Sequence, residues 1–569
     1  MSSLSSIVKA NSGLFAAQKG LQVTGHNITN VNTEGFTRQQ LLQSDSPYIT
    51  IGENGGNAQQ VGLGVNQDEI RQIRDQLADK RLRQENSILS YYQKLNQTIS
   101  DVESIFDEPY GDTITDMIND FWSQAQKLST APDGVEERLS FISTAKVLTS
   151  KVNDVAFSLT EYQEKLNADL LKGVNRVNEI IAGIQEMNEK IAMAEANGDN
   201  ANDYRDTRNN YLDELSIYGE VKYFEEADHR VQVKFENHVV VNKSLDIRIE
   251  MKDITNSPFK LPMWSDSKGE VFKLDVESNS KLENDMGSLK AILVARGNNI
   301  ATNETTWKDI ALNDNRSVDE VGNAFIIPKV QKMLHEFVKE ITSMVNSSFD
   351  GTGIGIQEGK DGVPVYIPLA SSDQREFIAS YEQMMQAKND LYKNPNDAAI
   401  KAKYEQEEQR HQAVADRMLI AGNIQVNPQL LENGGYNLLG TVSKDISKSP
   451  TINNTGDNTI VRDFLTKWGS NKTWYNGGDV NAPHTKSVNI ATYFSELVTD
   501  VGSQGNVIKD KAEEKSITVN NIQNERLSMG GVSLDEEFKN MLQYQYAYNA
   551  SARMITLLDS MIDTIVNKI

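Results

Sequence analysis

The sequence contains no cysteine, which excludes disulfide bonds and metal sites built on thiolates. It also lacks any apolar run approaching the ~18 residues that a membrane-spanning helix needs. Its first residues, MSSLSSIVKANSG, contain no apolar stretch of the kind that defines a secretory signal peptide. We therefore expect no membrane partner and no cleaved signal peptide. Taken alone, these absences suggest a cytoplasmic protein.

Positive charge is in short supply. The chain has 57 Lys plus Arg residues against 80 Asp plus Glu residues, for a net charge of −23. A surface with this balance is repelled by nucleic acid and by anionic membranes, so we expect no nucleic-acid partner. A hydrophobic content of 38% and a mean hydropathy of −0.50 are typical of a soluble, helix-rich protein. The 569 residues are enough for three or four domains.

Residue patterns that carry chemistry are also scarce. The six histidines show no paired metal-ligand spacing, and His335 lacks the second histidine of a zinc-binding HExxH motif. The glycine-rich segment 351–355 follows a helical pattern, whereas a phosphate-binding loop follows a strand. The acidic segment 199–203 lacks the Gly and the spaced Glu of a calcium loop. We therefore predict no catalytic residue, no cofactor and no metal, and the chain is not expected to be an enzyme.

The C-terminal stretch has the most regular pattern. Ser533 and Glu536 stand in the positions of a helix-capping box, and neither Gly nor Pro interrupts the residues that follow. Residues in steps of four and three form the predicted C-terminal seam, which includes Leu534, Phe538, Met541, Tyr548, Ile555, Leu558, Ile562 and Ile565. One helix cannot bury such a stripe by itself, so this helix needs partner helices. We expect the face with Leu558 and Ile562 to be exposed in the monomer and buried in an assembly.

The N-terminus carries a matching half-pattern. Its seam consists of Ile7, Leu14, Leu21 and Ile28. A ridge of small residues runs beside it, made of Ala10, Gly13, Ala17, Gly20 and Thr24. Small residues let two helix backbones approach closely, but each interior Gly costs ~1 kcal/mol relative to Ala. The N-terminal helix should therefore order mainly when packed. The two ends either assemble with other chains or close into an ordinary intramolecular bundle, and periodicity leaves both alternatives open.

Between the ends, helical periodicity comes first. A long helix with a thin, charged middle is predicted from Asn66, and residues 135–196 form the longest periodic run. Asn197 and Gly198 break that run, and residues 204–216 favour a helix that folds back.

The pattern then changes. From Val221 apolar residues alternate and β-branched residues are frequent, which predicts a β-rich insertion that could be removed without loss of assembly. A charged stretch with a break at Pro395 favours a solvated helical hairpin over about residues 370–418. Residues 420–485 are rich in Asn and Gly and indicate irregular or β structure. Helical spacing returns at 490–524, and residues 527–531 would form a joint before the last helix.

Together these patterns predict a mainly α fold with inserted β structure. A long helical rod module of near-axial, coiled-coil-like helices is formed from both chain ends and carries outer β-rich insertion domains. The predicted parts are terminal axial core helices at 1–62 and 533–569, a helical rod at 63–220, 286–355 and 486–532, a β-rich insertion at 221–285, and a second insertion at 356–485 with the charged hairpin.

Both ends carry motifs that resemble those of bacterial flagellar axial proteins. Residues 13–39 read GLFAAQKGLQVTGHNITNVNTEGFTRQ and are similar to that family's N-terminal helix, Asn-rich turn and Thr-x-Gly-aromatic element, with Phe36 where Tyr is expected. Residues 531–567 read GVSLDEEFKNMLQYQYAYNASARMITLLDSMIDTIVN and resemble the C-terminal signature. Rod, hook and junction proteins share both signatures.

Inner segments are more specific. GLGVNQDEIRQIRDQLADKRLR from Gly62, YRDTRNNYLDELS from Tyr204 and the run 327–353 look like the hook-associated protein 1 family, which forms the hook–filament junction. The resemblance covers roughly residues 1–355 and 420–569, and residues 370–416 depart from the family pattern. It implies a structural component of the flagellum that is exported through the flagellar channel and joins hook to filament by self-assembly.

The implied partners follow from that resemblance. They are copies of the chain in a ring or helical lattice, hook protein on one side, a second junction protein towards the filament, and an export chaperone before secretion. The seam residues at both ends, together with Phe36, would form the assembly interface. Two alternatives remain open: another axial protein of the hook or rod, and a soluble coiled-coil scaffold whose ends are closed.

Overall fold

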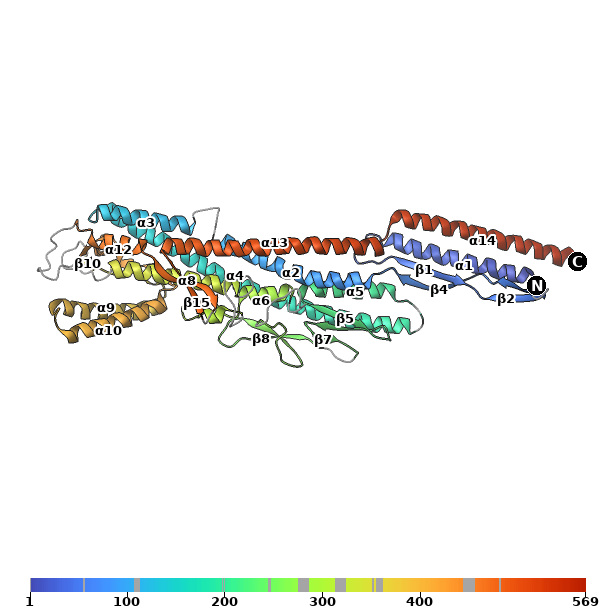
Figure 1. Ribbon diagram of the computed structural model, residues 1–569, viewed down its shortest axis with the longest axis horizontal. Coiled ribbons are helices and arrows are strands. Elements are labelled where there is room, and N and C mark those ends of the chain that lie inside the picture. Colours follow the sequence, from blue (N-terminus) through green and yellow to red (C-terminus); the bar gives the residue numbers. More distant parts are fainter. Residues whose placement is uncertain are drawn as a thin grey trace.

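The structure, a computed structural model, describes residues 2–54, 57–106, 113–196, 198, 200–243, 247–274, 286–312, 324–349, 353–354, 362–443, 456–479 and 482–568. The molecule is elongated, and both chain ends lie at the same end of it (Figure 1). Long helices form the body and several small sheets attach to them. This confirms the predicted fold class, mainly α with inserted β. None of the described helices is long and apolar enough to cross a bilayer.

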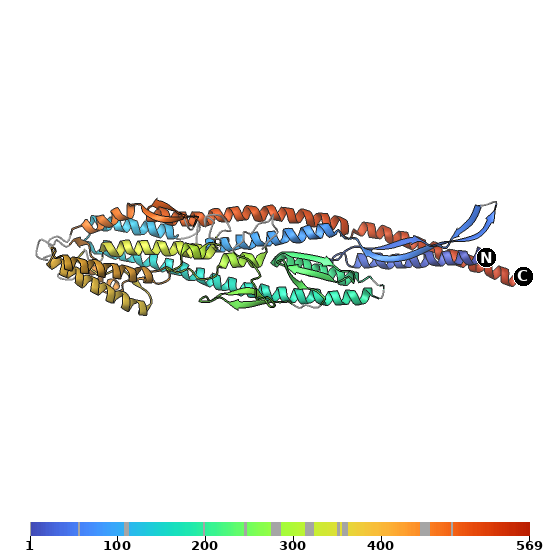
Figure 2. The same ribbon diagram turned by 60° about the horizontal axis from the view of Figure 1, so that its bottom comes forward.

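The two ends of the chain form one narrow unit, which we call the tip. Its elements are α1 (Ser2–Thr29), β1 (Gln39–Asp45), β2 (Tyr48–Asn54), β3 (Asn57–Gly62), β4 (Val65–Gln72) and α14 (Leu534–Lys568). Strand β1 pairs antiparallel with β4, and β2 pairs with β3, so the chain makes a long two-stranded arm. In Figure 2 the β2–β3 end of this arm leaves the line of the helices. The predicted boundary at 62/63 falls inside the arm.

The helix predicted from Asn66 begins later than expected. Residues 65–72 form β4, and α2 begins only at Gln76. The side chain of Asp75 accepts hydrogen bonds from the backbone N–H groups of Leu77 and Ala78, which caps the first turn. The prediction was wrong because Ile70 was assigned to a helical seam, whereas it pairs with Leu41 of β1. Pairing with a distant strand overrode the local period.

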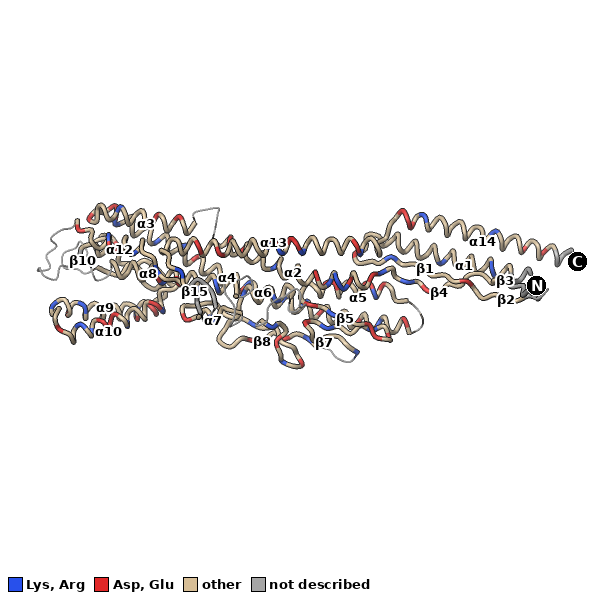
Figure 3. Tube along the Cα trace, viewed as in Figure 1, with Lys and Arg blue, Asp and Glu red and all other residues tan. Residues whose placement is uncertain are grey.

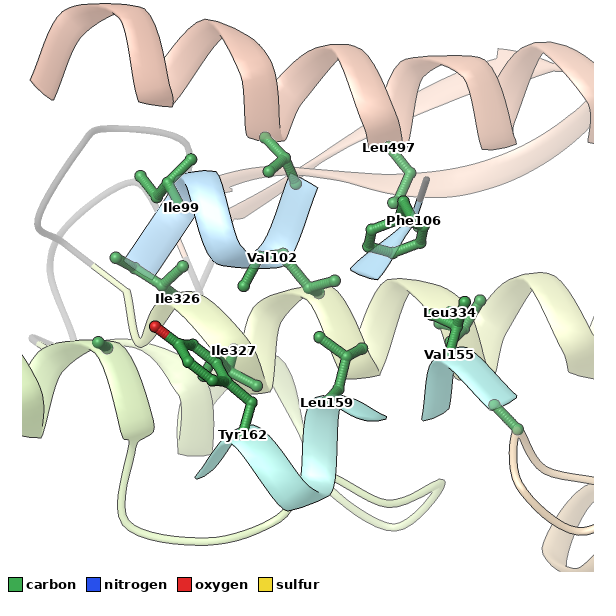
Figure 4. Packing of buried hydrophobic residues seen from close by; sticks show 14 of the residues in the cluster. Ile99, Val102, Phe106, Val155, Leu159, Tyr162, Ile326, Ile327, Leu334 and Leu497 are labelled. Atoms are coloured by element: carbon green, nitrogen blue, oxygen red, sulfur yellow. The ribbon is translucent and has the colours of Figure 1, made fainter. Parts of the chain in front are cut away.

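The rest of the molecule is a thick bundle, which we call the rod. Its main helices are α2 (Gln76–Ile105), α3 (Ile114–Thr130), α4 (Val135–Glu195), α5 (Asn202–Tyr218), α6 (Ser288–Arg296), α7 (Trp307–Ile310), α8 (Ile326–Phe349), α12 (Thr459–Gly469) and α13 (Ile490–Gly530). One continuous apolar core joins all of these helices except α7, whose Ile310 packs with Ala324 in a separate small cluster. Figure 4 shows part of the continuous core, where side chains of α2, α4, α8 and α13 meet. The long helix α4 matches the predicted run of 135–196 and supplies much of this core.

The β-rich stretch is part of the rod and not an appendage. Its strands are β5 (Val221–Glu225), β6 (Val231–Phe235), β7 (His238–Val241), β8 (Ile249–Asp253) and β9 (Lys260–Trp264). Phe235 and Trp264 are buried in the same apolar core as the rod helices. Removing this stretch would expose that core, so we expect the deletion to disturb the rod, and its effect on assembly stays a prediction. The predicted residues 275–285 lie outside the described residues.

The end of the rod farthest from the tip carries the second insertion. Its elements are β10 (Gly353–Ile354), β11 (Tyr366–Pro368), α9 (Ser371–Lys393), α10 (Ala398–Met418), β12 (Ile424–Val426), α11 (Pro428–Leu431), the 3-10 helix η1 (Gly435–Leu438), β13 (Val442–Ser443), β14 (Lys472–Asp479) and β15 (Ala482–Val488). Helices α9 and α10 form the expected hairpin and project from the body (Figures 1 and 2). The stretch 420–485 also contains α12, which sequence reasoning missed.

Candidate assembly interface

Helices α1 and α14 pack against each other in antiparallel directions. A Cβ atom at Gly13 would meet the Ser551 side chain, and one at Gly20 would lie only 2.5 Å from the Tyr544 ring. Gly20 is therefore needed for this close approach, whereas at Gly13 the Ser551 hydroxyl could turn aside for a small side chain. The face of α1 that is buried consists of Ala10, Ala16, Ala17, Gly20, Val23, Thr24 and Asn27, and it includes most of the predicted ridge of small residues. The two terminal helices thus partner each other within one chain.

The predicted α1 seam occupies a different position from this ridge. Its residues Ile7, Leu14, Leu21 and Ile28 are only half-buried. Phe36 is also half-buried and packs edge-on against the His26 ring at 5.4 Å between centroids. The seam therefore flanks the contact with α14, and part of its apolar surface stays open to solvent.

The predicted α14 seam splits into two groups. Met541, Ile555 and Ile562 are half-buried and Leu558 is buried, on the face that carries Tyr544 and Ser551. The expectation that Leu558 and Ile562 lie exposed in the monomer is therefore wrong, because α1 covers them. The exposed group is Leu534, Phe538 and Tyr548. The side chain of Ile565 lies outside the described residues.

An apolar stripe lies on the solvent side of α14, and the predicted seam included only its first two residues, Leu534 and Phe538. Leu534, Phe538, Leu542 and Tyr546 follow steps of four, and Met554, Leu557 and Met561 continue the stripe. We call these seven residues the outer stripe; each is at least 42% exposed. Charged residues are sparse along α1 compared with the rod (Figure 3). The four-residue spacing could have revealed the stripe, but the stronger 4–3 pattern beside it was taken instead.

A buried polar cluster anchors the first turn of α14. Glu537 is 2% exposed, and its two carboxylate oxygens accept from Arg38 Nε at 2.7 Å and from Asn27 Nδ2 at 3.1 Å. Asn27 also donates to the Gln39 carbonyl and accepts from the Gln39 N–H. The backbone of Arg38 donates to the Gly530 carbonyl and accepts from the Ile73 N–H. We call Asn27, Arg38 and Glu537 the node, because α1, β1 and α14 meet there.

Behind the node, a second set of charges holds the rod helices together where the tip begins. Arg83 of α2 and Arg526 of α13 both donate to Asp213 of α5, each at 2.6 Å. Burial acts to raise the pKa of Asp213, but Arg83 and Arg526 outweigh it and hold that pKa below the ordinary carboxyl value. The sequence reading treated residues 80–85 as a thin seam, whereas Arg83 is almost fully buried. The carboxylate partner supplied by α5 allows this burial.

The chain crosses between rod and tip at a cleft of about 600 Å³, lined by residues of segments 31–38, 73–75 and 523–536. Helix α13 continues through Gly530, so the predicted joint at 527–531 is limited to its last residue and the short link after it. The Thr37 N–H donates to Asp206 at 3.1 Å, which ties the link to α5. These contacts are structural. Among the described residues no group of His, Asp and Glu is arranged to hold a metal ion.

Two buried histidines also have structural roles. His335 Nε2 lies 2.9 Å from the Ala301 carbonyl, and the Ala421 N–H donates to its Nδ1 at 3.2 Å. The ring is therefore neutral, with the proton on Nε2. Burial lowers the pKa of His335 to about 4, and it lowers the pKa of His411 in the α9–α10 hairpin to the same value.

Comparison of the sequence with known proteins finds matches over the whole chain. A family model described as the flagellar hook-associated protein FlgK helical domain matches residues 68–324, and a flagellar basal body rod FlgEFG protein C-terminal model matches residues 523–568. Flagellar hook-associated protein 1 of Bacillus subtilis is 24% identical and covers 98% of this chain and 97% of its own length. The protein of that name from Escherichia coli is 21% identical and covers all of both chains.

The chain is therefore similar over its whole length to flagellar hook-associated protein 1. A solved structure of the flagellar hook junction protein FlgK from Burkholderia pseudomallei aligns over 52% of this chain and 47% of its own, with 16% identity and a TM-score of 0.38. Within the family match, the helical-domain model begins in β4 and ends just before α8. The C-terminal model covers the end of α13 and all of α14, and so includes Glu537 and the outer stripe.

Proposed function

We propose that this protein is a structural component of the bacterial flagellum that joins the hook to the filament by self-assembly at the hook tip. The observation that carries the proposal is the outer stripe, which gives the end of the chain an apolar face without a partner in the monomer. Apolar patches of this kind mark sites of protein association. The full-length similarity to flagellar hook-associated protein 1 supports the same role.

The partners follow from that role. Copies of the chain would pack side by side in a ring or helical lattice through the tip, with α14 supplying the outer stripe. Hook protein would meet the assembly on one side and a second junction protein on the other, towards the filament. Before export through the flagellar channel, a chaperone would cover the exposed apolar surface of the tip. The role is structural and requires no catalysis or cofactor.

The main alternative is a soluble coiled-coil scaffold with closed ends. The pairing of α1 with α14 within one chain is what that alternative expects. The outer stripe separates the two readings, because a closed scaffold would have no use for seven exposed apolar side chains on one terminal helix.

The test uses a strain that lacks this gene and a matched pair of exposed phenylalanines. Phe538 in the outer stripe is 47% exposed, and Phe157 on α4 of the rod is 52% exposed. Wild-type protein and Phe157→Asp should restore filaments, seen by electron microscopy. Phe538→Asp should yield hooks without filaments, with filament subunits released into the medium. Normal filaments with Phe538→Asp would contradict the proposal, as would failure of the wild-type gene to restore them.

A further inference from the structure

The small residues at the contact between α1 and α14 do not by themselves fix how far one helix is shifted along the other. The contact places Gly20 opposite Tyr544 and Gly13 opposite Ser551. Sliding α14 by one heptad towards the free end would put Tyr544 opposite Gly13 and Ser551 opposite Ser6, so these two contacts would again meet small residues, while Leu558 would move past the end of α1. Such a slide is about 10 Å, seven residues of helix rise. Steric fit alone therefore permits two registers.

The node distinguishes these registers. In the observed register Glu537 lies opposite Asn27 and accepts its hydrogen bond at 3.1 Å, while Arg38 Nε donates to the other carboxylate oxygen. In the slipped register the first two turns of α14 would be drawn out to span the longer link, so Glu537 would leave its place beside Asn27. Asn27 and Arg38 would lose the carboxylate they share. A buried polar group with a single matching site is a known way to fix the register of packed helices.

The short covalent link between α13 and α14 does not prevent the slide by itself. Of residues 534–540, the first two turns of α14, Glu537 alone is buried. Those turns are therefore held mainly by the node, together with an ion pair between Arg38 and the exposed Glu536 at 3.3 Å. Unwinding seven residues from a rise of 1.5 Å to about 3.3 Å each would gain ~12 Å, enough to allow the slide.

We propose that Glu537 is a positioning residue that sets the register of the terminal helix pair through Asn27 and Arg38. The register decides how far the outer stripe projects along the molecule, and so where a neighbouring subunit would meet it. This last step rests on the proposed function, whereas the register itself is a property of the monomer. The two can be tested apart.

The absence of cysteine allows a direct measurement of register by disulfide trapping. A Cβ at position 13 would lie 4.0 Å from the Cβ of Ser551, which falls within the range of about 3.5–4.5 Å found in disulfides. Gly13→Cys with Ser551→Cys therefore reports the observed register. Ser6→Cys with Ser551→Cys reports the slipped register, because these positions are about 10 Å apart in the observed one.

In the otherwise unchanged monomer, mild oxidation should crosslink the 13/551 pair and leave the 6/551 pair reduced. Adding Glu537→Ala should lower the 13/551 yield several-fold and raise the 6/551 yield by a similar factor. Asp535→Ala is the matched control, since Asp535 is an exposed carboxylate on the same turn and should leave both yields unchanged. Glu537→Gln, which keeps an acceptor for Asn27, should give an intermediate result.

An unchanged 13/551 yield in the Glu537→Ala protein would overturn the proposal, as would loss of both crosslinks, which would mean that the helices separate and do not slide. Complementation of the deletion strain then tests the link to assembly. Glu537→Ala should reduce filament number, whereas Asp535→Ala should not. Shifted crosslinks together with normal filaments would support the role of Glu537 in setting the register. They would also show that this register is not required for assembly. Failure of the wild-type gene would count against the proposed function alone.

Discussion

The rod and the tip are both built mainly from long helices, but they bury their apolar side chains to very different extents. In the rod, Phe121, Phe141 and Phe464 are fully buried and pack ring against ring across three helices. In the tip, the contact between α1 and α14 is made largely by small residues, and large apolar side chains remain on the outside. The rod can therefore stabilise itself, whereas the tip keeps much of its apolar surface for another partner.

This contrast means that equal mutations should have unequal effects in the two regions. In the rod an apolar truncation removes packing and leaves a cavity. In the outer part of the tip it removes surface that the monomer does not use. The following measurements test that difference, beginning with the largest expected effect.

Phe141→Ala should cost about 3–5 kcal/mol in the free energy of unfolding, because it empties a closed aromatic cluster. Phe15→Ala, at a side chain of α1 that is 53% exposed, should change that free energy by less than about 0.5 kcal/mol. Urea unfolding of both purified variants, followed by circular dichroism, checks the pair. Similar losses in the two variants would contradict the comparison.

Two neighbouring leucines of α14 allow the buried and the exposed face of the tip to be compared. Leu558 is 9% exposed and Leu557 is 61% exposed. Leu558→Asp places a charge against α1 and should weaken the helix pair by about 2–3 kcal/mol, whereas Leu557→Asp should leave the monomer unchanged. The 13/551 crosslink yield in each background measures this, and it should fall only for Leu558→Asp.

The same two variants should differ less in assembly, because both positions matter there. Leu557→Asp should block filament formation while its monomer keeps a normal crosslink. A stable Leu557→Asp monomer that still builds filaments would remove the outer stripe from the proposed interface.

Acid should act on the rod through His335. The pKa of the folded-state ring is about 4, against 6.5 for an ordinary histidine. Below pH 6.5, His335 of the unfolded chain therefore binds a proton, whereas His335 of the folded chain stays neutral. The free energy of unfolding falls as the pH is lowered, until the pH reaches about 4. Between pH 7 and pH 5 the expected loss from this residue is about 2 kcal/mol.

His335→Gln, which retains a donor and an acceptor, should reduce that loss of stability between pH 7 and pH 5 in urea titrations. His411 has the same shifted pKa and stays in place as an internal reference within the α9–α10 hairpin. An unchanged slope in the variant would show that His335 does not control the acid response.

The smallest effect is expected at the outer half of the α9–α10 hairpin. Phe377 and Met418 anchor its base in the core, but residues 398–410 of α10 are all exposed or half-buried. Replacing residues 389–407 with a short Gly-rich turn should change rod stability by less than about 1 kcal/mol. Thermal unfolding measures this change. A large fall in melting temperature would mean that the distal turns of the hairpin stabilise the rod.

The sequence by itself determined the helices whose apolar period is long and unbroken. Helix α4, the α9–α10 hairpin and α14 follow from local spacing, since a helix needs only its own residues to show its buried face. The family was also readable from the sequence, because its motifs are contiguous segments. The ridge of small residues, Gly13 and Gly20 included, was also readable as a face for close helix packing, but local spacing did not name α14 as its partner.

Tertiary structure alone decided what each face meets. The spacing of residues 65–72 favours a helix, but in the structure they form a strand because β1 pairs with them. Arg83 has the charge of a surface residue, but it is buried because Asp213 of α5 accepts its hydrogen bond. Leu558 and Leu557 are adjacent and chemically identical, yet one packs on α1 and the other faces solvent. The chain brings these partners together across more than a hundred residues in the case of Arg83 and more than five hundred in the case of Asn27 and Glu537. Local spacing contains no information about a contact of that range, because the partner and its direction are fixed only when the helices pack.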